Sequence, residues 1–395
     1  MTEGDTDGVL GRFIDDSHHT PPDRLGALVA DYVRSLGATE AVVYLSSIEQ
    51  RTLEPLTGYR VPARESLEID ATLGGRAFRT ITTLESPTDG KRRLWVPLLD
   101  GTARLGVLEL VTDRYDDRAV PQFRQFAGVV SELIVSRSLY GDLFTLVRRN
   151  RPMSLAAELQ WSLLPPQTFN DQRITVSAML EPAYDIAGDS FDYSFNGDIA
   201  HFIILDAMGH GFEATILAAV ALAAYRHARR SGYDLAQTYA TMDQAVAEQF
   251  GPDRFLTAQI GQLNAETGEM HWLNAGHPSP LHVRHGNLLG TLECTPTLPV
   301  GFGGAVSDIA KASLEPGDHV LFYTDGLVEA RSPEGEFFGE DRLGDLLVRA
   351  INAEQPAAEA SRRLVHAILS HQDNHLQDDA TTMLLNWHGP SGDRF

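Results

Sequence analysis

The stretch "IILDAMGHG", Ile203 to Gly211, leads three apolar residues directly into Asp206, and two glycines then flank His210. A short unbroken apolar run is typical of a strand that is buried on both faces. A carboxylate at the end of such a strand is costly unless another charge balances it. The stretch therefore predicts a buried strand whose last side chain serves a site rather than the core.

Three further segments place aspartate where a strand ends or a tight turn begins. They are "AYDIAGDSFD" with Asp189, "VLFYTDGLVEA" with Asp325, and "HLQDDATTMLL" with Asp378 and Asp379. One such aspartate is usually a turn residue or a helix cap. Four such places, each beside glycine or a second acid and none beside lysine or arginine in the sequence, indicate a bound divalent cation.

Mg²⁺ and Mn²⁺ prefer oxygen ligands, and sites with several carboxylates commonly hold two ions roughly 3.5–4 Å apart. Two such ions activate water as a nucleophile and take up charge on a leaving phosphate. The chain contains no "GxxxxGK[ST]", "HExxH" or "GxSxG" motif for a different chemistry. Hydrolysis of a phosphoester by water is the reaction class that we expect.

Composition sets the wider limits. The chain has 395 residues, of which 43% are hydrophobic, enough for two or three domains. Its formal net charge of −22 argues against nucleic acid as a partner. No apolar run reaches the roughly 18–20 residues that cross a membrane, and the N-terminus does not resemble a secretory signal. The single cysteine, Cys294, excludes an internal disulfide, so a cytoplasmic protein is expected.

Residues 20–138 alternate helical and strand patterns and predict a compact α+β domain. They resemble a GAF domain in "AVVYL", "GGRAFRT" and "LWVPLLDGTARLGVLELV". The resemblance implies a sensor domain that binds a small molecule or a protein. A domain that only packs or dimerises is the open alternative, because no residue pattern names a ligand.

Residues 140–166 predict a helical linker. Leu155, Leu159 and Leu163 recur every four residues on one helix face, and Pro152 is expected to kink or restart the helix. We interpret this stripe as the contact of a homodimer that passes a signal from the first domain to the next. A plain linker helix that packs on the following domain is the alternative.

Residues 167–390 predict an α+β domain of antiparallel sheets with flanking helices, because the helices occur as long runs. The segments "AGDSFDY", "LDAMGHG", "RFLTAQIGQLN", "LNAGHPSPL", "LPVGF", "DHVLFYTDGLVEARSPEGEFFG" and "DDATTMLL" occur here in order. With them, the region resembles the metal-dependent type 2C serine/threonine protein phosphatases. It is most similar to the bacterial branch named for the stage II sporulation E phosphatase and the sigma-B regulatory phosphatases. This implies an α-β-β-α sandwich.

The resemblance also implies the roles of individual residues. It assigns two Mn²⁺ or Mg²⁺ ions to the side chains of Asp189, Asp206 and Asp325, the carbonyl oxygen of Ala207, and either Asp378 or Asp379, with Asp378 preferred. Asp192 is expected to orient a water on the metal. His210 is a candidate proton donor, although support of its loop is the alternative, and His277 is expected to shape a loop. Ala187-Gly188 departs from the two glycines that the family usually carries.

The function implied by the resemblance is hydrolysis of phosphoserine or phosphothreonine in a protein, without a phosphoenzyme. The implied substrate is a phosphorylated anti-anti-sigma factor. Two alternatives stay open at this point: a regulatory module that binds a partner through the same cleft without hydrolysis, and a hydrolase of small phosphoesters. The filled acidic positions favour an enzyme over the regulatory module.

Overall fold

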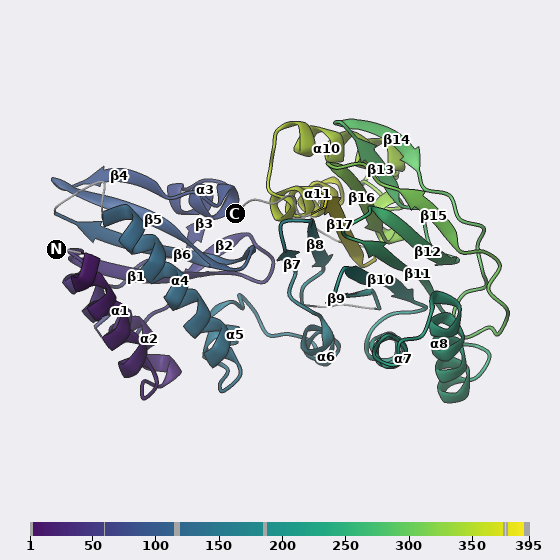
Figure 1. The fold of residues 1–395 in the computed structure, drawn as a ribbon, viewed down its shortest axis with the longest axis horizontal. Coiled ribbons are helices and arrows are strands. Elements are labelled where there is room, and N and C mark those ends of the chain that lie inside the picture. The colour runs from purple at the N-terminus through teal and green to yellow at the C-terminus, as the bar shows by residue number, and fades with distance from the viewer. Residues whose placement is uncertain are drawn as a thin grey trace. The chain divides into compact units, whose positions relative to one another are not determined.

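The computed structural model describes residues 3–58, 60–113, 119–184, 188–373, 376 and 378–390. The chain divides into two compact units, Met1–Pro152 and Met153–Phe395. Figure 1 shows both units along the chain, with helices as coils and strands as arrows.

The first unit is built on a six-stranded antiparallel sheet with the strand order β3-β2-β1-β6-β5-β4. Its strands are β1 (Glu40–Ser46), β2 (Thr52–Pro55), β3 (Leu67–Glu68), β4 (Leu84–Thr88), β5 (Lys91–Asp100) and β6 (Ala103–Thr112). Its helices are α1 (Glu3–Ser17), the short 3-10 helix η1 (Pro22–Arg24), α2 (Leu25–Ser35), α3 (Leu73–Thr80), α4 (Ala119–Ser138) and α5 (Leu143–Val147).

Helices cover both faces of this sheet. Val43 and Leu45 of β1 belong to the apolar core that α1, α2, α4 and α5 also form. Val42 and Tyr44 lie on the opposite face, in a second core that includes Phe78 of α3. This alternation follows from the two-residue period of a strand. The unit is an α+β domain, and its GAF-like character stays a prediction.

The second unit contains two antiparallel sheets, ordered β15-β12-β11-β10-β9 and β14-β13-β16-β17-β8-β7. Its strands are β7 (Thr168–Asn170), β8 (Ile174–Glu181), β9 (Ser190–Asn196), β10 (Ile199–Ala207), β11 (Leu256–Asn264), β12 (Glu269–Ala275), β13 (Leu281–Arg284), β14 (Asn287–Thr291), β15 (Ala310–Ser313), β16 (Asp318–Tyr323) and β17 (Ala380–Trp387). Its helices are α6 (Leu155–Leu163), α7 (Phe212–Arg230), α8 (Leu235–Phe250), α9 (Asp325–Val328), α10 (Glu340–Asn352) and α11 (Ala357–His371).

The two sheets face each other across one apolar core and carry helices on their outer faces (Figure 1). Phe202 of β10 meets Phe322 of β16 across the interior, with ring centroids 4.9 Å apart. Helices α7 and α8 pack on the outer face of the first sheet, and α10 and α11 on that of the second. The predicted α-β-β-α sandwich is confirmed.

Burial on both faces explains the apolar run at the end of β10. Ile203 and Leu205 belong to the core beneath α7 and α8, whereas Phe202 and Ile204 belong to the core between the sheets. The next inward position along the strand is Asp206, because side chains alternate with a period of two. The run therefore aims this carboxylate at the end of the space between the sheets.

The predicted helical connector consists of two helices, as expected if Pro152 restarts the helix. Helix α5 ends at Val147 and α6 begins at Leu155, with Pro152 between them. Leu155 is 68% exposed, whereas Leu163, on the same face, packs against the core beneath α7. The leucine stripe therefore packs on the second unit at one end and meets solvent at the other.

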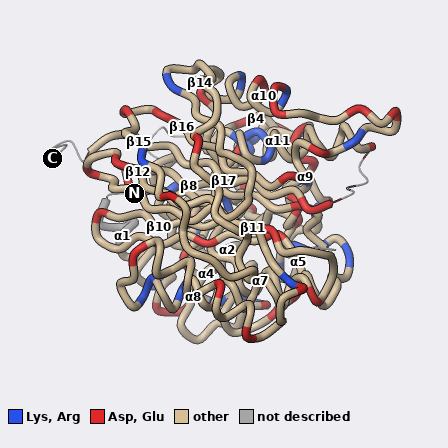
Figure 2. Tube along the Cα trace, turned by 90° about the vertical axis from the view of Figure 1, so that its right-hand side faces the viewer, with Lys and Arg blue, Asp and Glu red and all other residues tan. Residues whose placement is uncertain are grey.

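Two features of the chain concern its charge and its relation to membranes. Figure 2 shows acidic positions spread over helices and loops of many elements. Within the described residues, no helix combines the length and the apolar character that crossing a membrane requires.

We expect Phe202→Ala to lower the free energy of unfolding by about 3–5 kcal/mol, because it leaves a cavity opposite Phe322. Urea unfolding monitored by circular dichroism measures the change. Leu289→Ala is the control, since Leu289 is 57% exposed and its loss should cost less than about 1 kcal/mol. Equal effects of the two substitutions would contradict the packing described here.

Candidate metal-binding site

Both sheets contribute acidic or hydroxyl side chains to one end of the sandwich. Asp189 precedes β9 and is 2% exposed, and its Oδ2 accepts a hydrogen bond of 2.6 Å from Thr324 Oγ1. Thr324 follows β16, and its Oγ1 also accepts a hydrogen bond of 3.0 Å from the backbone N–H of Thr381 in β17. The ends of β9, β16 and β17 are thereby tied together around the Asp189 carboxylate.

Close backbone packing at this end requires glycine. A Cβ atom on Gly188 would lie 2.6 Å from the carbonyl oxygen of Ala207, and one on Gly326 would lie 1.9 Å from that of Asp379. Gly209 and Gly211 both have positive φ angles, 96° and 74°, which side-chain-bearing residues rarely adopt. These angles explain why glycines follow Asp206: the chain must turn sharply from β10 into α7.

The carboxylates at this end repel one another. Burial raises the pKa of Asp206 to about 7, and the charges of Asp325, Asp378 and Asp379 add to the effect. Burial, then the charges of Asp206 and Asp379, hold the pKa of Asp189 well above its ordinary value. Burial and the neighbouring Asp378 likewise raise the pKa of Asp325. Such mutual shifts occur only where like charges share a small, poorly solvated space.

Asp378 and Asp379 differ in their surroundings. Asp379 is 4% exposed, and its Oδ2 accepts hydrogen bonds from the backbone N–H groups of Gly188, at 2.8 Å, and Asp189, at 3.3 Å. Asp378 is exposed and lines a pocket of about 170 Å³ together with Asp325. Asp379 therefore holds the loop before β9, and Asp378 keeps a carboxylate open to the pocket.

The donor set fits hard divalent cations. Among the described residues, Asp189, Asp206, Asp325 and Asp378 form no ion pair with lysine or arginine. Uncompensated, partly buried carboxylate oxygens are the ligands that Mg²⁺ and Mn²⁺ prefer. In the part of the chain that the structure describes, no three acidic, histidine or cysteine side chains already surround one common point.

Asp192 does not take part in this site, and the expectation that it orients a water on the metal was wrong. Its carboxylate accepts hydrogen bonds from Arg226 at 2.9 and 3.1 Å and from Arg229 at 3.1 Å. Both arginines belong to α7, which covers the outer face of the sheet. Asp192 therefore ties β9 to this helix, because its position points away from the space between the sheets.

The two histidines lie in different environments. His210 is exposed between Gly209 and Gly211, on the loop that follows Asp206. His277 is 5% exposed, its Nδ1 lies 2.7 Å from Thr257 Oγ1, and burial lowers its pKa to about 3. The Asn274 side chain bridges the N–H and C=O groups of His277 at 2.7 and 2.8 Å, so this histidine supports a loop, as predicted.

Two residues of the site were missed by sequence reasoning. Thr324 binds the Asp189 carboxylate directly, and Gln160 of α6 is fully buried and donates a hydrogen bond to the Asp189 carbonyl oxygen. Gln160 could have been noticed in the sequence, because it is a polar residue inside the otherwise largely apolar segment "LQWSLL". Ala187, where the chain departs from the usual two glycines, lies outside the described residues.

The second unit is similar to known proteins in sequence and in fold. Residues 196–388 match the family model described as stage II sporulation protein E, or SpoIIE. The SiaA-PP2C domain of Pseudomonas aeruginosa superimposes with a TM-score of 0.51 at 22% identity, covering 59% of this chain and 94% of that one. A structure of the RsbU and RsbW domains of a Mycobacterium tuberculosis protein gives a TM-score of 0.50 at 25% identity, covering 56% and 61%.

Two curated relatives cover the same part of the chain. Phosphoserine phosphatase RsbU of Bacillus subtilis is 22% identical over 242 residues, which are 59% of this chain and 69% of that protein. Protein IcfG of a Synechocystis strain is 23% identical over 255 residues, which are 58% of this chain and only 40% of that protein. The chain thus spans less than half the length of IcfG.

The sandwich has the fold of a PP2C domain. Within that fold class, the second unit carries a SpoIIE-type domain, because residues 196–388 match the SpoIIE family model.

The raised pKa of Asp206 predicts how metal-free protein responds to pH. Because the folded value, about 7, exceeds the ordinary 3.8, the folded state holds this proton more tightly, and stability is lost as pH rises through 7. In EDTA at pH 8, Asp206→Asn should therefore exceed wild type in stability by on the order of 2 kcal/mol, and the gap should shrink toward pH 5.

Urea unfolding at several pH values measures this difference. Asp198→Asn is the matched control, because Asp198 lies in the turn before β10 and is 61% exposed. A pH-independent gap between wild type and Asp206→Asn would show that the Asp206 carboxylate is not under repulsion.

Proposed function

We propose that this chain is a phosphoserine/phosphothreonine protein phosphatase that uses two Mn²⁺ or Mg²⁺ ions. The observation that carries the proposal is the set of carboxylates without basic partners, among them Asp206 and Asp325, that repel one another at one end of the sandwich. The similarity to a protein named phosphoserine phosphatase RsbU supports the reaction class.

In this proposal, Asp189, Asp206, Asp325 and Asp378 hold the ions through their side chains, and Ala207 does so through its carbonyl oxygen. Bound ions of this kind supply Lewis acidity and a nucleophilic water. Thr324 fixes the rotamer of Asp189, and the glycine contacts hold the Ala207 carbonyl near the acids. Asp379 holds the loop before β9 by accepting a hydrogen bond from the backbone N–H of Gly188.

The proposed substrate is a phosphorylated anti-anti-sigma factor. Its support is the resemblance to sigma-B regulatory phosphatases, together with the similarity to RsbU and to the structure of RsbU and RsbW domains. A protein substrate also suits an open site, because Asp325 and Asp378 line a pocket at the surface.

We further propose that the first unit acts as a GAF-like sensor and regulates the second through a dimer of the connector. Exposed apolar side chains occur along the connector and directly before it: Tyr140 is 81% exposed, Leu155 is 68% exposed, and the preceding Leu139 is 81% exposed. Apolar side chains at such exposure are suited to a contact between two copies. Helix α6 of the connector reaches the site, because its Gln160 holds the Asp189 carbonyl.

The activity test is release of phosphate from a phosphoserine-bearing anti-anti-sigma protein with Mn²⁺, with Mg²⁺ and with EDTA. We expect release only with metal, and a loss of at least about 100-fold in Asp206→Asn and Asp325→Asn, because each removes a charged metal ligand. Asp198→Asn, with the same chemical change at an exposed position, should keep wild-type turnover.

The outcomes separate the possible functions. Near wild-type turnover in either site variant would mean that the site is misplaced. Metal binding without turnover would favour a regulatory binding module. A strong preference for small phosphoesters over the phosphoprotein would favour a general phosphoesterase.

The regulatory proposal predicts different turnover in the full chain and in residues 153–395, the second compact unit. The coupling free energies of regulated proteins lead us to expect a change of about 5- to 150-fold. Phosphate release at matched metal and protein concentrations measures it. Identical turnover of both proteins, with sedimentation showing that both are monomeric, would remove this part of the proposal.

A further inference from the structure

A hairpin after α9 carries one arginine to the pocket beside the proposed metal ligands. Arg331 and Phe337 form an antiparallel bridge, and the N–H of Ser332 donates to the Glu336 carbonyl at 2.9 Å. The turn between them is closed by the Gly335 N–H, which donates to the Ser332 carbonyl at 2.8 Å. These bonds define the Arg331 hairpin, residues 331–337.

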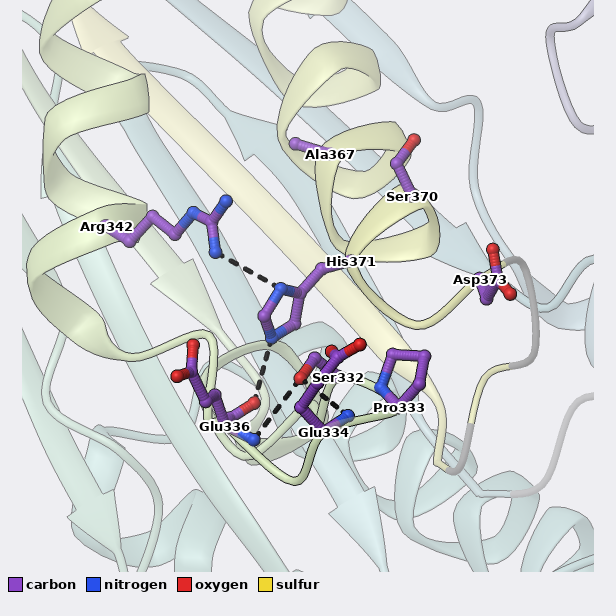
Figure 3. A pocket seen from close by; sticks show the side chains of 9 residues that line it. All are labelled: Ser332, Pro333, Glu334, Glu336, Arg342, Ala367, Ser370, His371 and Asp373. Atoms are coloured by element: carbon purple, nitrogen blue, oxygen red, sulfur yellow. Dashed lines mark hydrogen bonds between the residues drawn. The ribbon is translucent and has the colours of Figure 1, made fainter.

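Side chains of α10 and α11 anchor the Arg331 hairpin (Figure 3). His371 Nε2 donates to the Glu336 carbonyl at 3.0 Å, and Arg342 donates to His371 Nδ1 at 3.1 Å. The Ser332 hydroxyl accepts hydrogen bonds from the N–H groups of Glu334 and Glu336 at 3.2 and 3.3 Å. The hairpin is therefore held in place by the domain itself.

Arg331 is oriented by a ring rather than by an acid. Its guanidinium carbon lies 4.1 Å from the centre of the Phe337 ring, and Phe337 is 52% exposed. Within the described residues, Arg331 forms no salt bridge. Stacking on an aromatic face fixes the guanidinium plane and leaves its N–H donors available.

The pocket needs a cation of this kind. Arg331 lines the same pocket, of about 170 Å³, as Asp325, Asp378 and Glu329. A phosphate monoester carries nearly two negative charges, so these carboxylates repel it unless positive groups balance them. Bound metal ions would meet part of this need, and a planar guanidinium can bind two phosphate oxygens at once.

Arg254 is a second arginine near the site, beside the loop that follows Asp206, and its partner is a carboxylate. It lies beside Gly209, but its Nη2 donates to Glu213 at 2.6 Å. An arginine engaged by a carboxylate has less positive charge to offer an incoming anion. Arg331 is therefore the better candidate for binding an incoming anion.

We propose that Arg331, stacked on Phe337, binds the phosphate group of the substrate beside the metal ions. This inference rests on the proposed phosphatase function and adds the residue that receives the phosphoserine phosphate. The guanidinium orients the phosphate through paired hydrogen bonds, and the hairpin holds the guanidinium ready before substrate arrives.

The test is calorimetric titration of inorganic phosphate into the Mg²⁺-loaded full chain. Arg331→Gln should weaken phosphate binding about 10- to 100-fold, because it removes a charge-assisted bidentate contact. Arg331→Lys should recover only part of the affinity, and Phe337→Leu should weaken binding by a smaller factor. Arg349→Gln is the matched control, since Arg349 is 75% exposed on α10. This variant should bind phosphate with the affinity of the wild-type protein.

Two further measurements fix the interpretation. Mg²⁺ affinity, titrated without phosphate, should be unchanged in Arg331→Gln, and a parallel loss of metal affinity would overturn the proposal. With the phosphoprotein substrate, Arg331→Gln should raise KM by a factor similar to the loss of phosphate affinity.

The outcomes separate this inference from the proposed function. Equal phosphate affinity in wild type and Arg331→Gln, or no phosphate binding by wild type, overturns the role of Arg331. Phosphate binding that depends on Arg331, in a chain that hydrolyses no phosphoserine protein, supports the anion site and contradicts the phosphatase function.

Discussion

Repulsion among carboxylates at one end of a rigid sandwich is the interaction on which the site depends. Strand β10 is buried on both faces, so Asp206 at its end stays close to the charges of Asp189 and Asp325. The raised pKa values of Asp189, Asp206 and Asp325 express this cost. A domain that holds acids in this way binds cations readily, because each bound cation relieves the repulsion.

The sandwich fixes the acids through its backbone as much as through its side chains. Gly188 and Gly326 allow two carbonyl groups to approach more closely than any side chain would permit. Thr324 links the first sheet to the second through Asp189 and Thr381. The site therefore rests on strand ends rather than on free loops, which is the arrangement that preorganised chemistry requires.

The arginines around the site have different kinds of partner. Asp192 forms ion pairs with Arg226 and Arg229 of α7, and Glu213 forms one with Arg254. Arg331 instead stacks on the ring of Phe337. An aromatic partner orients a guanidinium without neutralising it, whereas a carboxylate neutralises it. This difference leaves a cation at the rim of an acidic pocket, which suits a substrate that is itself an anion.

The sequence by itself determined the strands that carry the site and the strand-end aspartates, because apolar period and glycine placement act over a few residues. The four-layer order was implied by the family resemblance. The tertiary structure alone decided which partner each charge has. Asp192 binds arginines 34 and 37 residues away, and Gln160 reaches Asp189 across 29 residues. Asp379 is buried, whereas its neighbour Asp378 is exposed. Such pairings depend on distances between distant segments, which no local pattern encodes.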